Sequence, residues 1–390
     1  MPSVVRELRC PHAPICTPCP FRGLPYREQL RRKRVRVETE LAKYPALYGA
    51  VLEEVVGSRD LFGYRNVAKL AVRSDRRGRL SAGVYEPGSH RLAEASQCSV
   101  HHPAVNEVVA ATLAEATALG LSAYDERRGS GDLRYIVARY SALLRRVLLV
   151  LVTAAPPSAE LRNLARRLGR RCRPLGGVVH NLNRDSGNVI LGRQWATLRP
   201  PAELVDRIGF LKLGVSPASF LQANLWTARR IYETALEWAK PRPNEVAVDL
   251  FAGVGPLSFY LATRAARVIG VEEAPSAVRD ARSNQRRNGF HNLRFEEGPA
   301  EDVLMRMRAE LPRAELVTLN PTRKGASPKL LETIAELSPE RVVYVSCDAQ
   351  TLARDLDRLA AHGYRTLTLR PFDMLPQTEH VEVVALAARG

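Results

Sequence analysis

Long apolar runs are absent from this 390-residue sequence. The longest, such as residues 147–155, fall well short of the ~20 residues that a membrane helix needs. The amino-terminal stretch MPSVVRELRCPH also lacks the apolar segment of a secretory signal. Internal repeats and low-complexity tracts are missing as well. These absences predict a soluble, cytoplasmic protein with no membrane partner, and they argue against a repeat array.

Acidic residues are too few to balance the basic ones. Lys and Arg total 58 against 41 Asp and Glu, which gives a formal charge of +17. Such an excess attracts polyanions such as RNA, and the attraction weakens as salt rises. Charge alone leaves both a nucleic-acid partner and a merely solvated basic surface open.

Length and pattern divide the chain into three parts, as expected at roughly 150 residues per domain. Residues 1–45 hold three cysteines and a helix predicted over 26–41. The positive charges of that helix form either a solvated face or a phosphate-binding surface. Residues 46–215 mix strand and helix patterns, which predicts a central α+β domain. RNA binding is expected to fall to this domain and to the basic helix. The stretch 199–217 within this part is interpreted as a connector.

Strands and helices alternate in the third part, residues 216–390. The strand-like segments are VAVDLF, RVIGVE, LVTLN and RVVYVSC, followed at the end by VEVVALAA. Helical patterns separate the first four of them. This alternation predicts an α/β fold, namely a Rossmann-like domain with a parallel sheet and an added C-terminal strand.

A glycine-containing turn follows the first of these strands, in the sequence DLFAGVG that ends at Gly255. Gly253 and Gly255 let the backbone turn tightly and approach a ligand closely. The next strand ends in acids, and Glu272, in preference to Glu273, can accept hydrogen bonds from the ribose hydroxyls of a nucleoside cofactor. The third glycine of the dinucleotide fingerprint is missing, so no pyrophosphate cradle is formed. The pattern therefore favours S-adenosylmethionine over NAD.

Five motifs occur in a fixed order along the chain. They are SFLQAN (219–224), DLFAGVG (249–255), LNPTRKG (319–325), VYVSCDAQTLARDL (343–356) and FDMLPQTEHVEVVAL (372–386). Together they resemble the RNA 5-methyluridine (uracil-5-) methyltransferases, which modify tRNA or 23S rRNA and several of which carry an iron–sulfur cluster. The resemblance covers essentially the whole chain and is greatest to the short 23S rRNA branch.

The resemblance implies a catalytic pair, with Cys347 as nucleophile and Glu382 as general base. Carbon 5 of uracil is a poor nucleophile until a thiolate adds to carbon 6, and a base must later remove the proton from carbon 5. It also implies that Gln222, Asn320 and Phe251 line the pocket for the cofactor and target base. His380 is expected to orient other groups, and Arg323 to anchor a phosphate or carboxylate.

Four cysteines form a candidate metal site: Cys10, Cys16, Cys19 and Cys98. Their spacing suits either a tetrahedral zinc ion or a cubane iron–sulfur cluster. The resemblance favours a [4Fe–4S] cluster, because cluster-bearing relatives have the same early triplet and a distant fourth cysteine. Such a cluster is expected either to be structural or to help hold RNA. His101 and His102 are possible ligands, but they are expected instead to begin a helix. Cys172 is expected to take no part in the metal site.

Three positions depart from the family pattern. Pro299 replaces an acidic residue near the expected adenine site, and Asp302 is the substitute considered for it. Thr322 replaces a proline in the loop after Asn320, and Asp348 replaces the asparagine after the nucleophile. Because nucleophile and base both remain, these departures bear on cofactor affinity more than on chemistry.

The predicted function is therefore methylation of a uridine at carbon 5. The expected substrate is 23S rRNA, with the T-loop of tRNA second, and the enzyme is expected to act as a monomer on an unpaired or flipped-out base. Two alternatives remain open. One is a catalytically inactive iron–sulfur protein that binds RNA. The other is an amino-group methyltransferase, which would need no cysteine nucleophile.

Overall fold

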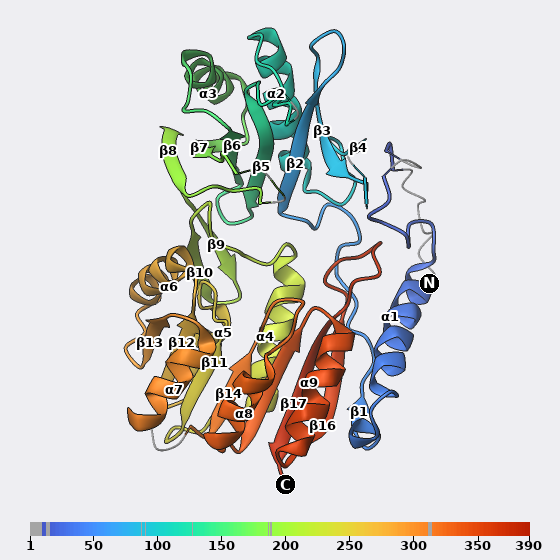
Figure 1. Ribbon diagram of the computed structural model, residues 1–390, viewed down its shortest axis with the longest axis vertical. Helices are drawn as coiled ribbons and strands as arrows, with labels where there is room; N and C mark the ends of the chain where they lie inside the picture. The colour runs from blue at the N-terminus through green and yellow to red at the C-terminus, as the bar shows by residue number, and fades with distance from the viewer. Residues whose placement is uncertain are drawn as a thin grey trace. The chain divides into compact units, whose positions relative to one another are not determined.

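The computed structural model describes residues 10–12, 16–86, 88–89, 91–126, 128–185, 187, 189–310 and 314–390. Contacts group the chain into two compact units (Figure 1). The central unit contains the described residues within 1–20, 60–206 and 215–218, and the C-terminal unit those within 21–59, 207–214 and 219–390. Residues 21–59 thus pack with the C-terminal unit, whereas the sequence pattern suggests boundaries near 45 and 215.

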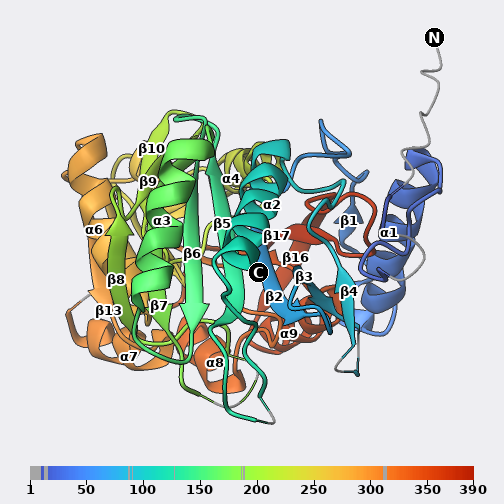
Figure 2. The same cartoon turned by 90° about the horizontal axis from the view of Figure 1, so that it is seen from above.

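The central unit is built on a seven-stranded sheet with the strand order β4-β3-β2-β5-β6-β7-β8. These strands are β2 (Val67–Ser74), β3 (Leu80–Tyr85), β4 (Leu92–Glu94), β5 (Leu133–Ser141), β6 (Arg146–Thr153), β7 (Leu175–Leu182) and β8 (Gln194–Arg199). Two helices, α2 (Pro103–Ala118) and α3 (Ala159–Arg171), lie side by side over one face of the sheet (Figure 2). β6 and β7 run parallel because α3 connects them, and the other neighbouring strands are antiparallel.

Sequence periodicity explains this packing. In β2 the alternate residues Ala68, Leu70 and Val72 enter the apolar core beneath the helices. In α3 the buried residues recur at helical spacing: Leu161, Leu164, Ala165 and Leu168. The ring of His102 caps α2 by accepting a hydrogen bond from the Ala104 amide at 3.2 Å, which confirms that the histidine pair begins a helix.

The C-terminal unit holds an eight-stranded sheet with the strand order β1-β16-β17-β15-β14-β11-β12-β13. These strands are β1 (Val51–Leu52), β11 (Val246–Leu250), β12 (Arg267–Glu272), β13 (Leu293–Glu297), β14 (Leu316–Leu319), β15 (Arg341–Ser346), β16 (Tyr364–Phe372) and β17 (Glu382–Arg389). β11 to β15 are parallel, and β17 is antiparallel to both β15 and β16. This arrangement matches the predicted parallel sheet with an added C-terminal strand.

Helices cover both faces of this sheet. They are α4 (Leu225–Ala239), α5 (Pro256–Ala262), α6 (Pro275–Asn288), α7 (Ala300–Glu310), α8 (Pro328–Glu336) and α9 (Ala349–Ala361). In β11, Val248 and Leu250 face the core that α7, α8 and α9 share. Asp249 points to the opposite face, where the Ser258 hydroxyl of α5 hydrogen-bonds it at 2.5 Å. The sheet is therefore buried on both sides, as parallel sheets require.

Three further features complete the fold. Helix α1 (Tyr26–Leu41) has the bounds predicted from its sequence, and it lies beside α9 and β16 (Figure 1). The expected connector contains a short hairpin of β9 (Leu204–Ile208) and β10 (Leu211–Val215). Within the described residues, no helix has both the length and the apolar character needed to cross a membrane.

Candidate active site

Cys347 and Glu382 meet at one end of the sheet. β15 ends at Ser346, immediately before Cys347, and β17 begins with Glu382. The antiparallel register pairs Ser346 with Val383, so Cys347 and Glu382 are the next opposing residues. Opposing residues of an antiparallel pair project to the same side. Two residues far apart in sequence are thereby held together at the carboxyl end of the parallel strands, where open α/β sheets bind their ligands.

The environment of Cys347 opposes formation of its thiolate. Burial raises the pKa of the Cys347 thiol, and the neighbouring Glu382 carboxylate raises it further. Arg323 acts in the opposite direction because its positive charge favours the thiolate. The thiol is only partly buried, so a substrate can approach it. Its reactivity therefore depends on the charge state of Glu382.

Glu382 has the properties of a general base. Burial raises its pKa to about 7, and the charge of Arg323 partly offsets that rise. No described residue donates a hydrogen bond to this carboxylate, so its oxygens are available to a substrate. A carboxylate whose pKa lies near neutrality can accept a proton at physiological pH and release it again.

A loop after β14 brings Arg323 to the same place. One guanidinium nitrogen of Arg323 lies 3.4 Å from both ring nitrogens of His380, two residues before Glu382. Burial lowers the pKa of His380, and the Arg323 charge lowers it further. A neutral imidazole beside an exposed guanidinium leaves Arg323 as the positive charge that acts on both catalytic candidates.

Tyr232 is a buried neighbour that sequence reasoning missed. It belongs to α4, and burial raises its pKa while the charges of Glu382 and Asp249 raise it further. Its hydroxyl is therefore protonated and lies within electrostatic range of both carboxylates. The only sequence signal for it is the helical periodicity of α4, which predicts an inward side chain but no role.

The turn after β11 leaves space for a ligand. β11 has β12 on one side and β14 on the other, so the strand order reverses at this point. Gly253 has a φ of +58°, and a Cβ added there would meet no atom within 4 Å. Phe251, also at positive φ (60°), is partly buried against the apolar core. Gly255 is needed for a different reason, because a Cβ there would clash with the rings of Phe295 and Phe259.

Glu272 closes one side of this turn. One of its carboxylate oxygens accepts a hydrogen bond from the Gly253 amide at 2.9 Å, and the other accepts one from the Ala274 amide at 2.8 Å. The carboxylate thus lies at the open turn, as its assignment to a nucleoside ribose requires. Asp249 lies deeper, where burial raises its pKa to about 6, and the Thr318 hydroxyl hydrogen-bonds it at 2.6 Å.

Asn320 and Gln222 are the two amide side chains that the sequence assigns to the pocket. Asn320 follows β14, and its backbone amide bonds the Leu250 carbonyl at 3.2 Å while its side chain contacts no polar group among the described residues. Gln222 is partly buried just before α4. Asn224 caps α4 through the Thr227 amide and also donates to the Met374 carbonyl at 3.2 Å. Asn224 therefore ties the segment that carries Gln222 to the segment that precedes Glu382.

Helix α1 supports that preceding segment from the other side. Lys33 is buried and forms an ion pair with the buried Asp373, which also accepts a hydrogen bond from the Tyr26 hydroxyl at 2.9 Å. Gln29 and Gln377 bond each other twice, at 3.1 and 3.0 Å. Burial lowers the pKa of Lys33 and raises that of Asp373, while their mutual attraction opposes both shifts. The sequence contained no sign that a helix near the amino terminus holds the loop leading to Glu382.

Four further arginines of α1 are also engaged. Arg31 and Arg32 both pair with Glu28, at 2.7 and 2.8 Å, and Arg36 pairs with Glu379 at 3.2 Å. Arg34 pairs with Glu38 and donates to the carbonyl of Leu52. These contacts favour a structural helix over the phosphate-binding surface that its sequence also allowed.

Comparison with proteins of known sequence identifies the family of this chain. A family model for tRNA (uracil-5-)-methyltransferases matches residues 211–389. An uncharacterized RNA methyltransferase of Geobacter sulfurreducens is 39% identical over 380 residues, which are 97% of this chain and 77% of that protein. One from Halalkalibacterium halodurans is 36% identical over 380 residues, covering 97% of this chain and 83% of that protein. This chain belongs to the family of RNA (uracil-5-)-methyltransferases.

A solved member of similar structure confirms the fold class. The tRNA (uracil-54, C5)-methyltransferase of Pyrococcus abyssi, in complex with S-adenosyl-L-homocysteine, superimposes with a TM-score of 0.77 and 24% identity. The match covers 96% of this chain and 86% of that one. The predicted combination of a Rossmann-like methyltransferase domain with a mixed central domain is therefore correct.

Two departures from the family pattern have local structural reasons. Asp348 caps α9 by accepting a hydrogen bond from the Thr351 amide at 3.0 Å, a task that aspartate and asparagine perform equally well. Pro299 directly precedes α7, where the Val303 amide bonds its carbonyl at 3.0 Å. A proline costs little at this position, because the first amides of a helix have no partner within the helix. Asp302 is exposed in the first turn of α7.

The four candidate cysteine ligands converge only in part. Among the described residues, no group of three or more His, Cys, Asp or Glu side chains is placed to hold a metal ion. Cys98 lies within electrostatic range of Cys10, and the backbone amides of Val100 and His101 donate to its sulfur. Burial nevertheless raises the pKa of Cys98 overall. Cys172 is a buried thiol whose pKa burial raises to about 11, which is consistent with an inert side chain.

Proposed function

We propose that this enzyme forms 5-methyluridine in RNA, with Cys347 as the nucleophile and Glu382 as the general base. The observation that carries the proposal is the opposed placement of these two residues, Cys347 just after the carboxyl end of β15 and Glu382 at the amino end of the antiparallel β17. The turn after β11, which leaves space for a ligand, lies at the same end of the sheet. Other chemistries, such as methylation of an amino group, need no thiol beside a carboxylate of raised pKa.

Each residue has a defined task in this reaction. The Cys347 thiolate adds to carbon 6 of uracil, which makes carbon 5 nucleophilic enough to take a methyl group. Glu382 then accepts the proton from carbon 5, and the bond between the Cys347 sulfur and carbon 6 breaks to release the product. Arg323 stabilises the thiolate before attack, since its charge lowers the pKa of Cys347.

The methyl donor in this proposal is S-adenosylmethionine, whose sulfonium carries an electrophilic methyl group. Glu272 would hold the ribose hydroxyls, and the open backbone at Gly253 would accept the nucleoside. Phe251 would pack against the donor, while the side-chain amides of Asn320 and Gln222 would recognise the donor or the uracil edge. The donor set of this turn fits such a group, because it combines an accepting carboxylate with a glycine that has no neighbour in front of it.

The proposed substrate is 23S rRNA, with tRNA as the second choice, because the sequence Asn320-Pro321 resembles the short rRNA branch. The test is methyl transfer from labelled S-adenosylmethionine to unmodified 23S rRNA and to tRNA, followed by nucleoside analysis. Label in 5-methyluridine from 23S rRNA supports the proposal. Label in 5-methyluridine from tRNA alone would identify tRNA, rather than 23S rRNA, as the substrate. Donor binding without label in either RNA, or no donor binding at all, contradicts the assigned function.

We also propose that Cys10, Cys16, Cys19 and Cys98 hold a [4Fe–4S] cluster with a structural role. Supporting it are the approach of Cys10 to Cys98, and the two amides directed at the Cys98 sulfur, since such hydrogen bonds stabilise thiolates. Anaerobic purification followed by iron and sulfide analysis tests this proposal. Four irons and four sulfides per chain, both absent from Cys98→Ala, would support it. Stoichiometric zinc without iron would contradict the cluster and indicate a zinc site formed by these cysteines.

A further inference from the structure

A basic hollow in the central unit lies outside the candidate active site. It has a volume of about 620 Å³ and lies among the end of α3, the start of β6 and β7, and the end of β8. Its most distinctive lining residues are arginines: Arg146, Arg170, Arg171, Arg173 and Arg199. No acidic residue and no aromatic residue lines it. Electrostatic repulsion among so many guanidinium groups is unfavourable when no carboxylate lies among them. A bound anion would reduce that repulsion.

Most of these charges have no counter-ion. Arg170 and Arg173 are exposed and form no ion pair among the described residues. Arg146 donates only to the neighbouring Arg145 carbonyl, at 3.4 Å. Arg171 differs, because it pairs with Glu115 at 2.7 Å. The hollow therefore presents several unneutralised donors to solvent.

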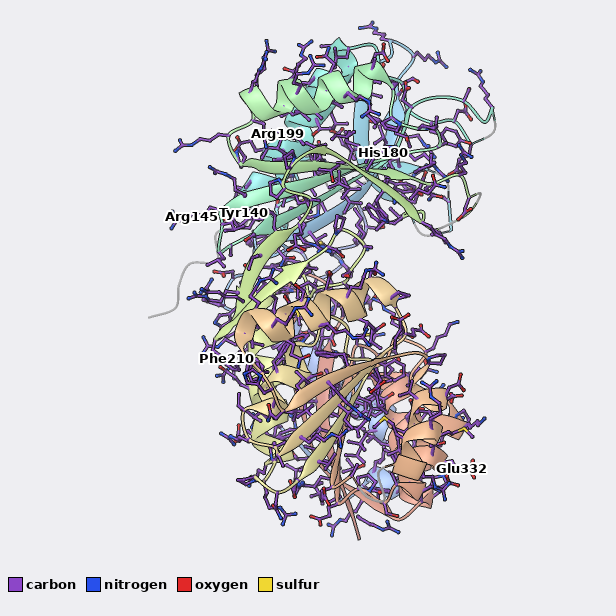
Figure 3. The ribbon with its side chains drawn as sticks, turned by 90° about the vertical axis from the view of Figure 1, so that its left-hand side faces the viewer. Tyr140, Arg145, His180, Arg199, Phe210 and Glu332 are labelled. Carbon is purple, nitrogen blue, oxygen red and sulfur yellow. The ribbon has the colours of Figure 1, made fainter. Side chains whose placement is uncertain are left out.

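Arg199 is held in place by the backbone around it. Its guanidinium donates to the Gly176 carbonyl at 2.6 Å. A Cβ on Gly169 of α3 would clash with the Nε atom of Arg199, so the glycine is what lets this side chain lie against the helix. Figure 3 shows Arg199 next to α3. A donor that is fixed before binding loses less conformational entropy when it contacts an anion.

We propose that this hollow binds the phosphates of the RNA backbone, an inference that rests on the proposed action on RNA. Guanidinium groups match phosphate oxygens in geometry and charge. The hollow has no aromatic ring on which a base could stack. It also has no carboxylate that could accept a hydrogen bond from a base or ribose. The contacts are therefore made to phosphate, and they position RNA without reading its sequence.

The test compares two double variants of the full-length protein that remove equal charge. Arg170→Gln/Arg173→Gln removes unpaired arginines of the hollow, and Arg31→Gln/Arg32→Gln removes arginines that pair with Glu28. RNA affinity is measured against salt concentration. We expect the hollow variant to bind roughly tenfold more weakly and to reduce the salt slope by about 2, or about 1 for each phosphate that is no longer neutralised. The α1 variant should keep the wild-type slope.

Equal weakening in both variants, or none in either, would overturn the proposal. Gly169→Ala provides a second measurement, since it leaves the formal charge unchanged and displaces Arg199. Weaker RNA binding by this variant, with an unchanged melting temperature, is the expected result, and wild-type affinity would contradict the role of Arg199. Nucleoside analysis of the wild-type product separates this proposal from the assigned reaction. If 5-methyluridine is absent but the hollow variant still shows the expected reduction in salt slope, only the assigned reaction is contradicted.

Discussion

Two clusters of arginine in this molecule look alike in sequence and differ in structure. Helix α1 carries Arg31, Arg32, Arg34 and Arg36, and the end of α3 carries Arg170, Arg171 and Arg173. The hollow beside α1 is lined by Glu28 and Glu54 as well as by arginines. The hollow beside α3 is lined by no acid at all. Most of the positive charge near α1 is thus neutralised internally, whereas Arg170 and Arg173 near α3 are available to a partner.

The difference teaches where RNA contacts should be sought. A run of basic residues predicts attraction to a polyanion only if the fold leaves those residues unpaired. α1 has a structural task in the C-terminal unit, because its Lys33 and Gln29 hold the loop before Glu382. Of the arginines at the end of α3, only Arg171 forms an ion pair among the described residues, with Glu115. The following predictions test this division, from the largest expected effect to the smallest.

Replacement of the nucleophile should separate catalysis from RNA binding. Cys347→Ser should lower formation of 5-methyluridine by at least about 10⁴-fold, because a serine hydroxyl is far less ionised than a thiol. RNA affinity and its salt slope should stay at the wild-type value, since no proposed phosphate contact is changed. Labelled-donor assays and binding titrations check this. Substantial turnover by the variant would remove Cys347 from the mechanism.

Replacement of the general base should both slow turnover and lower the pKa of the Cys347 thiol. Glu382→Gln should reduce turnover by about 10²- to 10⁴-fold. It should also trap a covalent protein–RNA adduct, because the proton on carbon 5 is no longer removed. Loss of the carboxylate charge should lower the pKa of Cys347. Mass spectrometry of Cys347 alkylation across pH measures that change, and an unchanged or higher pKa would contradict the proposed coupling.

The wild-type pH profile provides a related check. Glu382 must be deprotonated to accept a proton, and its pKa lies at about 7. Single-turnover rates should therefore rise as pH increases through about 7, and continue to rise as the Cys347 thiol, whose pKa is raised, ionises. A rate that falls over the same interval would mean that the protonated carboxyl is the active form.

Removal of the buried charge in α1 should destabilise the C-terminal unit. Lys33→Met leaves Asp373 buried without its partner, which should cost about 3–5 kcal/mol in the free energy of unfolding. The double variant Lys33→Met/Asp373→Leu should recover most of that stability, since no unpaired charge remains. Urea denaturation measures both. Equal destabilisation in both variants would indicate that packing, rather than the unpaired charge, determines the stability there.

The smallest effect is expected for the exposed arginines of α1. Arg36→Gln breaks only the surface pair with Glu379. RNA affinity should change by less than about twofold, because exposed ion pairs contribute little and Arg36 is not free to bind phosphate. A filter-binding or anisotropy titration is sufficient. A large decrease in affinity would place RNA contacts on α1. It would contradict the conclusion that only the arginine cluster near α3 contacts RNA.

The sequence by itself determined most of the local elements and named the candidate site residues. Apolar residues at helical spacing defined α1 and α3, and buried β-branched runs defined β11, β12 and β15. β13 and β16 escaped prediction because polar residues interrupt both segments, LRFEE and YRTLTLRPF. The ordered motifs identified Cys347 and Glu382 as a pair, which no periodicity alone would have done.

Only the tertiary structure decided which charges have partners. Lys33 is indistinguishable in sequence from its arginine neighbours, yet it alone of the charges at 31–36 is buried against a carboxylate. Arg199 and Gly169 become neighbours only when β8 packs beside α3. The raised pKa of Glu382 likewise arises from burial. Pairing and burial depend on residues distant in the chain, so the free energy of each charge is set by the fold and not by its sequence neighbours.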